Sequence, residues 1–228
     1  MKKRFWTYIS NGKHSIGSTG GMVYVYDEKD IEIAKFKDMN YAYNLTFFPD
    51  GEKFVSRSNE GLIAVYDLRN LRLIKKFRYG KAKDPHDGNL CVSADGKYIY
   101  VVVYTFDEKK NASNCWIDVY ETETFSLVET LFKESDIYPW YIEWGEENDV
   151  FYLLGSAKRG RNVIARCKGG YADVLSVSEN MERRYRNIKC WQLSGFTPKQ
   201  REWIYPKNEM LERLDAPLAE LWKRVNLQ

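Results

Sequence analysis

The sequence holds few residues of the kinds that carry out catalysis. Only two histidines occur among its 228 residues, so a mechanism that needs an imidazole base must use His14 or His86. His14 lies in a polar stretch, which indicates a surface or turn position, and His86 lies in the turn-forming sequence Asp-Pro-His-Asp-Gly at 84–88. No Gly-x-Ser-x-Gly elbow, phosphate-binding loop or dinucleotide fingerprint is present. The sequence therefore predicts a protein without catalytic activity or a cofactor.

Cysteine is the other residue type that would suggest a reactive or metal-binding site. The four cysteines are Cys91, Cys115, Cys167 and Cys190. Neighbouring cysteines lie at least 23 residues apart, so the paired spacing of a zinc site is missing. The pattern favours free, buried thiols over a disulfide framework or a metal site.

The N-terminal residues favour a cytoplasmic protein. Basic residues at 2–4 are followed by an apolar stretch that begins at Phe5 and ends before Asn11-Gly12, which is too short for the core of a secretion signal. The longest apolar run, at 98–104, is far too short to cross a bilayer. We therefore expect no association with a membrane.

A repeated phrase indicates how the chain is built. The phrase reads Val25-Tyr26-Asp27, Val65-Tyr66-Asp67 and Val119-Tyr120-Glu121. Each copy closes an apolar run, and a second run follows that ends in phenylalanine, at Phe36, Phe77 or Phe132. A period of tens of residues marks stacked structural units. The aromatic content of 15%, led by 17 tyrosines, favours strands over helices.

The second copy predicts four short strands joined by turns. Its apolar runs are 43–48, 53–58, 62–66 and 71–77, and the segments between them carry Gly, Asn or Asp. The first copy begins at Phe5, and the third covers 89–132 with an insertion at Phe106–Asn114. A weaker fourth copy covers Ile137–Ser178, with its first turn at 145–148 and its third strand at 162–167.

These residues resemble the β-propeller repeat proteins of the WD-repeat and YVTN-type groups. Phe47–Lys53 and Val92–Tyr98 resemble the turn between the first two strands of their blades, where a small residue or proline precedes Asp-Gly. Val65-Tyr66-Asp67 takes the place of their Trp-Asp or Tyr-Asp ending. The resemblance covers residues 4–178, is specific for architecture and says little about function. The Gly-His pair of true WD repeats is represented at most by His86.

The fold predicted from this resemblance is an all-β, small β-propeller. It has four full four-stranded blades, a partial or divergent fifth and a C-terminal helical tail, with the propeller at 1–205 and the tail at 206–228. Two interpretations of the last segment stay open. Arg186–Leu193 and Arg201–Tyr205 are compatible with strands of a fifth blade. Glu209–Leu214 and Leu218–Val225 place apolar residues at helical spacing, which favours a helical tail packed on the propeller.

The resemblance also suggests a test for a hydrolase. Propeller glycosidases carry two carboxylates on their innermost strands, because an acid and a second carboxylate must flank the scissile bond. The expected inner strands here, which include Leu90–Val92 and Tyr141–Trp144, hold a single acid, Glu143. YVTN-like lactonases need a larger ring than this length supplies. A hydrolase that uses Glu143 or His86 therefore ranks third among the functions considered.

Charge is distributed unevenly along the chain. Residues 1–83 carry a net charge of +7, residues 84–149 of −11 and residues 150–228 of +7. Such polarity favours the steering of a charged partner or self-association. Of the two basic clusters at 158–161 and 183–186, the second contains an aromatic residue, Tyr185, as nucleic-acid-binding surfaces do. The small overall excess of +3 nevertheless argues against a nucleic-acid partner.

The candidate binding residues lie where the last strand of one blade crosses to the first strand of the next. They are Tyr41, Tyr43, His86, Asp87, Tyr138, Trp140, Arg184 and Tyr185. The crossings share one face of a propeller, so exposed aromatic rings there would anchor a partner or stack on a sugar. The alternative is that the rings pack between blades.

The function expected from these observations is a non-catalytic binding module that presents these loops to a protein partner. The first alternative is a lectin-like propeller that binds a carbohydrate or another small ligand.

Overall fold

The computed structural model describes residues 4–79, 89–106, 112–147, 149–157, 160–177, 195–204 and 216–227. The chain divides into two compact units, and neither of them is contiguous in sequence. Unit 1 comprises residues 1–78 and 183–215, and unit 2 comprises residues 79–182 and 216–228.

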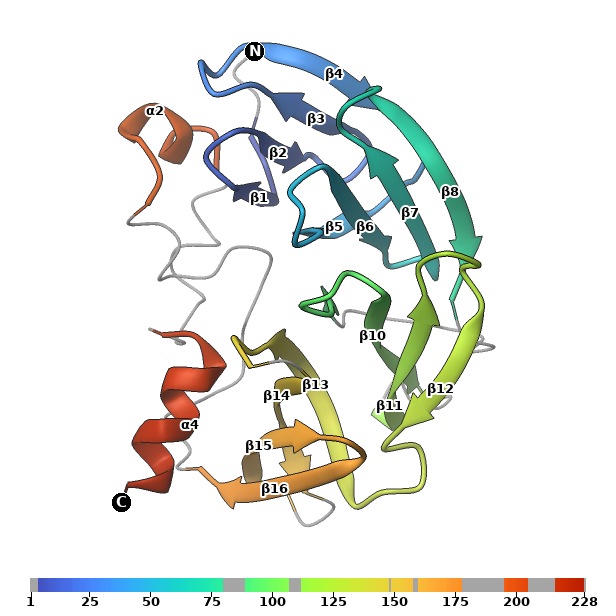
Figure 1. Cartoon of the computed structure of the whole chain (residues 1–228), viewed down its shortest axis with the longest axis vertical. Helices are drawn as coiled ribbons and strands as arrows, with labels where there is room; N and C mark the ends of the chain where they lie inside the picture. Colours follow the sequence, from blue (N-terminus) through green and yellow to red (C-terminus); the bar gives the residue numbers. More distant parts are fainter. Residues whose placement is uncertain are drawn as a thin grey trace. The chain divides into compact units, whose positions relative to one another are not determined.

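Unit 1 contains two four-stranded antiparallel sheets (Figure 1). The first sheet consists of β1 (Thr7–Ser10), β2 (Ser15–Ser18), β3 (Val23–Tyr26) and β4 (Glu32–Phe36). The second consists of β5 (Ala42–Phe47), β6 (Lys53–Ser58), β7 (Leu62–Asp67) and β8 (Arg72–Arg78). In both sheets the spatial order follows the sequence, as a meander requires. The turn predicted at Asp50-Gly51 forms, and Gly51 takes the positive φ of 68° that glycine adopts readily.

Unit 2 repeats this arrangement in two further sheets. The first consists of β9 (Leu90–Val92), β10 (Tyr98–Phe106), β11 (Ala112–Glu121) and β12 (Leu127–Leu131). The second consists of β13 (Ile137–Trp144), β14 (Val150–Ala157), β15 (Asn162–Lys168) and β16 (Tyr171–Ser176). The four predicted copies of the repeat are therefore confirmed as four sheets.

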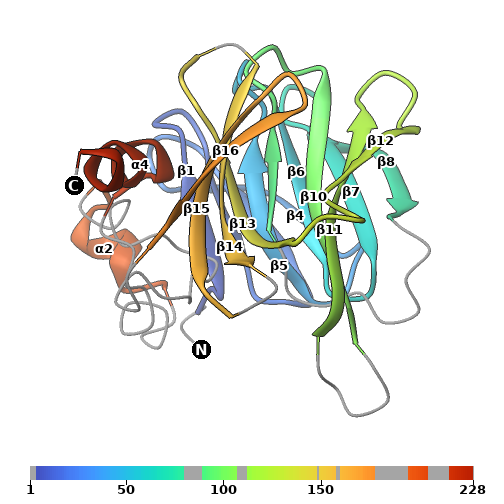
Figure 2. The ribbon, with the colours of Figure 1, turned by 90° about the horizontal axis from the view of Figure 1, so that it is seen from below.

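The predicted insertion at Phe106–Asn114 belongs to the β10–β11 hairpin. β10 continues to Phe106 and β11 begins at Ala112, so both flanks of the insertion extend the strands, with a register shift after Thr105. Figure 2 shows this hairpin running past the shorter strands β9 and β12 of the same sheet.

The burial of side chains changes from strand to strand across each sheet. The second and third strands are buried along most of their length, as in β6 and β14, whereas the fourth strands β8 and β16 are largely exposed. Within each unit the first strands of the two sheets contact one another, β1 with β5 and β9 with β13. Apolar side chains from the facing sheets fill the space between them and form the core.

The described segment 195–204 of unit 1 contains a short helix and one bridge. Helix α2 (Pro198–Arg201) begins at Thr197, whose hydroxyl accepts from the Gln200 N–H while the Gln200 side chain accepts from the Thr197 N–H. The interpretation of 201–205 as a strand is therefore wrong for Arg201, because this capping box favours a helical turn. Among the described residues 201–204, only Ile204 pairs, through a parallel bridge to Phe5. The predicted segments 186–193 and 209–214 lie outside the described residues.

Unit 2 ends in the predicted C-terminal helix, α4 (Leu218–Asn226). Its buried residues Leu218, Leu221 and Trp222 lie on one face, and the helix contacts β13, β14 and β15 (Figures 1 and 2). Glu143 holds the start of the helix, because its carboxylate accepts from the Leu218 N–H at 2.8 Å and from the Tyr141 hydroxyl at 2.6 Å. A carboxylate at a helix N-terminus is stabilising.

Candidate binding pocket

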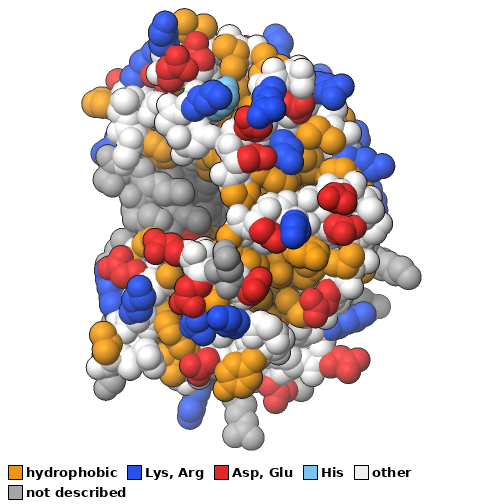
Figure 3. Space-filling view, in the orientation of Figure 1, with side chains coloured by type: hydrophobic (Ala, Val, Ile, Leu, Met, Phe, Trp, Pro, Cys, Tyr) orange, Lys and Arg blue, Asp and Glu red, His pale blue; other side chains and the backbone are white. Residues whose placement is uncertain are grey.

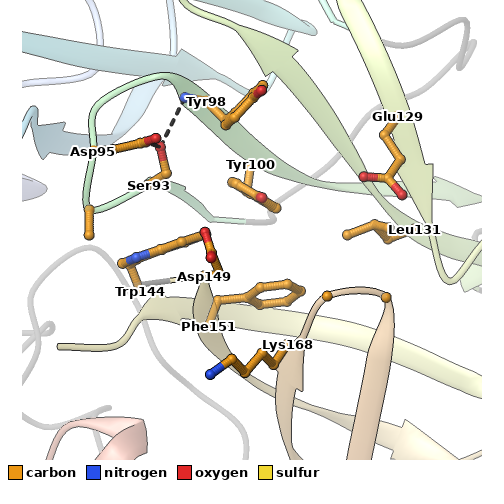
Figure 4. A pocket seen from close by; sticks show the side chains of 13 residues that line it. Ser93, Asp95, Tyr98, Tyr100, Glu129, Leu131, Trp144, Asp149, Phe151 and Lys168 are labelled. Carbon is orange, nitrogen blue, oxygen red and sulfur yellow. Dashed lines mark hydrogen bonds between the residues drawn. The ribbon is translucent and has the colours of Figure 1, made fainter. Parts of the chain in front are cut away.

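A half-open pocket of about 640 Å³ lies between the two sheets of unit 2 (Figure 4). It is lined by Ser93, Ala94, Asp95, Tyr98, Tyr100, Glu129, Leu131, Trp144, Asp149, Phe151, Lys168, Gly169 and Gly170. Figure 3 shows apolar side chains bordered by acidic ones over these sheets. The volume falls within the range of sites for small ligands and peptide side chains.

Three aromatic rings form the floor of the pocket. The centroid of the Tyr100 ring lies 5.0 Å from that of Trp144 and 5.3 Å from that of Phe151, and the last two rings lie 6.0 Å apart. Tyr100 comes from β10, whereas Trp144 and Phe151 come from β13 and β14 of the facing sheet. Phe151 is buried and the other two rings are half-buried. The rings support one another, so the floor is fixed before any ligand arrives.

One edge of the pocket is the β9–β10 turn. The Ser93 hydroxyl donates to Asp95 Oδ1 at 2.6 Å and accepts from the Tyr98 N–H at 3.0 Å, and Asp95 Oδ1 also accepts from the Lys97 N–H. The hydrogen bond from Ser93 lowers the pKa of Asp95 below its ordinary value. Asp95 is therefore a fixed negative charge at the edge of the pocket.

The opposite edge is formed by two turns of the other sheet. Gly169 and Gly170 both have positive φ, and they join Lys168 to its cross-strand partner Tyr171 as a two-residue hairpin turn. Asp149 also has positive φ, 63°, a conformation that aspartate tolerates better than most residues. These backbone conformations place Asp149 and Lys168 beside the aromatic floor.

Asn89 connects the two walls of the pocket. Its side-chain amide donates to the Ile142 carbonyl at 2.7 Å and accepts from the Ile142 N–H at 2.9 Å. Both residues are buried. The Asn89 amide thus satisfies both the N–H and the carbonyl of Ile142 in β13. It joins the segment that precedes β9 to the facing sheet.

Carboxylates make the pocket electronegative. Asp95, Glu129 and Asp149 carry three negative charges against one positive charge on Lys168. Burial raises the pKa of the Tyr100 hydroxyl, and the carboxylates of Glu129 and Asp95 raise it further. Figure 4 shows the Glu129 carboxylate directed toward Tyr100 and the Lys168 ammonium directed away from the rings.

The predicted binding residues Tyr41 and Tyr43 lie together in unit 1. Their ring centroids are 6.2 Å apart, and Tyr43 also lies 6.0 Å from Trp6. The Tyr41 side chain is 51% exposed, and this residue has positive φ. The crossing from β4 to β5 thus presents the exposed ring of Tyr41 beside the half-buried rings of Tyr43 and Trp6.

Tyr138 and Trp140 lie at the start of β13, in unit 2. Both are half-buried and pack against the core of that unit. They occupy the opposite end of β13 from Trp144, which lines the pocket. Because Tyr41 and Tyr43 belong to the other unit, an opening shared by all four rings stays a prediction.

The other predicted binding residues, His86, Asp87, Arg184 and Tyr185, lie outside the described residues. His14 is half-buried after the first turn of β1–β2, and burial lowers the pKa of its imidazole. Glu143, the candidate hydrolase acid, contacts the start of α4 as described above.

The described ranges also bear on metal binding and on membrane association. Within the described ranges, no group of three or more His, Cys, Asp or Glu side chains is arranged to hold a metal. Cys91, Cys115 and Cys167 are buried there and form no disulfide, and Cys190 lies outside those ranges. No described helix is long and apolar enough to span a membrane.

Sequence reasoning missed the pocket residues. Two features of the sequence could have indicated them. The i, i+2 spacing of Tyr98 with Tyr100 and of Glu129 with Leu131 places each pair on one face of its strand. The second feature is the acidic charge of residues 84–149.

Solved structures share the architecture of this chain. Hydrazine synthase from Kuenenia stuttgartiensis aligns with a TM-score of 0.58 at 14% identity, over 74% of this chain and 52% of that one. The β-propeller domain of Cps50 (Swd1) from Myceliophteria thermophila aligns with a TM-score of 0.54 at 18% identity, over 78% and 51%. These neighbours are β-propellers. The fold is a small β-propeller.

The dihydro-heme d1 dehydrogenase NirN, in complex with DHE, aligns with a TM-score of 0.56 at 20% identity, over 78% of this propeller and 37% of that chain. The propeller thus spans between about a third and a half of the structures named here. No family model and no curated protein matches the sequence. The similarity shows the fold alone, and the neighbours include enzymes. It identifies no ligand.

Proposed function

We propose that this propeller is a non-catalytic binding module whose partner is a protein with an exposed basic segment. The observation that carries the proposal is the pocket of unit 2, where an aromatic floor formed by Tyr100, Trp144 and Phe151 lies among three carboxylates. Aromatic residues in partly buried pockets are typical anchors of protein interfaces. Carboxylates at the rim steer a basic partner and select against an acidic one.

The charge of the surrounding sequence supports the same partner. Residues 84–149, which supply nine of the thirteen pocket residues, carry a net charge of −11. Long-range attraction of this kind raises association rates and falls as salt concentration rises. A polyanion such as a nucleic acid would be repelled from this region.

The experiment is a comparison of three fluorescent, unstructured peptides of one length that carry four lysines, four glutamates or neither. We expect the lysine peptide to bind, with an affinity that falls between low and high salt, and the glutamate peptide not to bind. The double variant Glu129→Gln with Asp149→Asn should weaken binding, whereas Glu123→Gln, at an exposed turn outside the pocket, should not. Equal binding of all three peptides would refute the proposal.

A neutral sugar is the second candidate ligand. Aromatic rings beside carboxylates also suit a carbohydrate, because the rings stack on the sugar and the oxygens accept from its hydroxyls. A glycan array probed with the same chain separates the candidates. Sugar binding that is insensitive to salt, with no response to the lysine peptide, would favour the lectin-like function.

A further inference from the structure

We propose that the pocket of unit 2 takes the alkylammonium end of a lysine side chain; this inference rests on the proposed binding of a basic segment and names the group recognised.

The floor attracts a cation. An ammonium group placed on the face of an aromatic ring is stabilised by the negative quadrupole of that face, most strongly for tryptophan. The floor of the pocket offers three rings, from Tyr100, Trp144 and Phe151, that are already in mutual contact. The apolar stem of a lysine side chain would also lose contact with water there.

The rim supplies the countercharge. Glu129 and Asp149 line the pocket, and both are exposed residues that form no ion pair with any other described residue. Asp95 is held ionised by Ser93, although Lys97 lies 3.7 Å from its second oxygen. These two carboxylates, which form no ion pair with a described residue, can therefore accept from a ligand ammonium.

The arrangement favours an ammonium over a guanidinium. Arginine is recognised best by a bidentate carboxylate and a flat aromatic stack, because its guanidinium is planar and its donors form a rigid fork. Here the three carboxylates come from three separate elements, and the Tyr100 ring is inclined by 50° to Trp144 and by 43° to Phe151. A compact, freely rotating ammonium matches such a curved floor with dispersed acceptors.

Lys168 provides a test of the sign of the ligand charge. Lys168 is the single cationic residue among the thirteen that line the pocket. For a cationic ligand the Lys168→Ala variant should bind about two- to fivefold more tightly, because an exposed like charge is removed. An anionic or zwitterionic ligand would instead bind more weakly.

The probe is n-butylammonium, followed by NMR as the upfield ring-current shift of its methyl protons on titration with the full chain. The comparison probes are n-butanol, which has the same stem without the charge, and n-propylguanidinium. We expect binding of n-butylammonium only, and at least a tenfold loss in Tyr100→Ala or Trp144→Ala. Trp144→Phe should weaken binding less than Trp144→Ala, because it keeps an aromatic ring and removes an indole N–H that has no acceptor among the described residues.

The outcomes separate the two proposals. Binding of n-butanol as tightly as n-butylammonium, tighter binding of n-propylguanidinium or weaker binding by Lys168→Ala would each overturn the alkylammonium site. If n-butylammonium fails while the lysine peptide still binds and depends on Glu129 and Asp149, this inference is wrong and the proposed function stands. If n-butylammonium binds and no basic peptide does, the site stands and the protein partner is wrong. Trp144→Phe and Lys168→Ala keep the test decisive if an alanine variant does not fold.

Discussion

Replacing Asn89 by alanine tests whether a single side chain holds the two sheets of unit 2 together. The substitution removes both hydrogen bonds to Ile142 and leaves a buried N–H and a buried carbonyl without partners. Each such loss costs about 1–3 kcal/mol, so the free energy of unfolding should fall by about 2–6 kcal/mol. This is a large share of the roughly 5–15 kcal/mol that stabilises an ordinary domain.

Urea denaturation provides the measurement. With a slope of about 2 kcal/mol per molar urea, the expected loss moves the midpoint down by about 1–3 M. Asn226→Ala is the matched control: this asparagine is exposed on α4, so its replacement should change stability by less than about 0.5 kcal/mol. Asn89→Asp should also destabilise, because a carboxylate accepts from the Ile142 N–H but cannot donate to its carbonyl.

Hydrogen exchange gives a local readout of the same variant. The Ile142 amide should lose protection in Asn89→Ala relative to amides in the middle of β14. If Ile142 stays as protected as in the parent chain and the urea midpoint shifts no more than in Asn226→Ala, then Asn89 does not hold β13 and the reasoning fails.

Three further substitutions test other parts of the structure. In Gly17→Ala the new Cβ would lie 2.6 Å from the buried Phe5 ring, so the free energy of unfolding should fall by about 1–3 kcal/mol, measured as a lower melting temperature. The control Gly21→Ala, with open space around the new Cβ, should have little effect. In Asp118→Asn the Trp116 and Thr130 donors keep their acceptor. Burial raises the pKa of Asp118 above 3.8, so the free energy of unfolding of the parent falls as pH rises through the pKa of the folded state. The variant should therefore be at least as stable as the parent at pH 7 and show a flatter stability profile above pH 4 in urea titrations. Less stability than the parent at pH 7 would contradict this account. Glu143→Ala should increase amide exchange throughout α4 and lower the free energy of unfolding by about 1–3 kcal/mol, because the Leu218 N–H and the Tyr141 hydroxyl lose their acceptor. The control Glu146→Ala should leave the amides of α4 protected.

The sequence was sufficient for the repeat because turn chemistry is local. Asp50-Gly51 and Asp95-Gly96 each place a glycine at positive φ between strands, so the strand boundaries could be predicted from neighbouring residues. The helix at 218–226 was likewise indicated by the spacing of its own apolar residues.

The pocket could not be predicted in the same way because it depends on register. Its floor combines β10 with β13 and β14, and register shifts occur between Pro139 and Tyr141 in β13 and between Val119 and Tyr120 in β11. A shift of one residue moves the following side chains to the other face of a strand. Sequence alone therefore did not show that Trp144 faces Tyr100. The role of Glu143 was missed for a similar reason, since its partner Leu218 is 75 residues away.

The bridge between Phe5 and Ile204 has a consequence for synthesis on the ribosome. The Phe5 N–H donates to the Trp203 carbonyl, and the Phe5 ring is enclosed partly by Trp203. About two hundred residues must be translated between these partners, which takes roughly 10–40 s at 5–20 residues per second. During that time strands β1–β4 can pair locally, but Phe5 and Tyr8 lack the aromatic cover that 196–204 provides. We therefore expect the nascent chain to expose an apolar surface around Phe5 and Tyr8 until residues 196–204 have been synthesised.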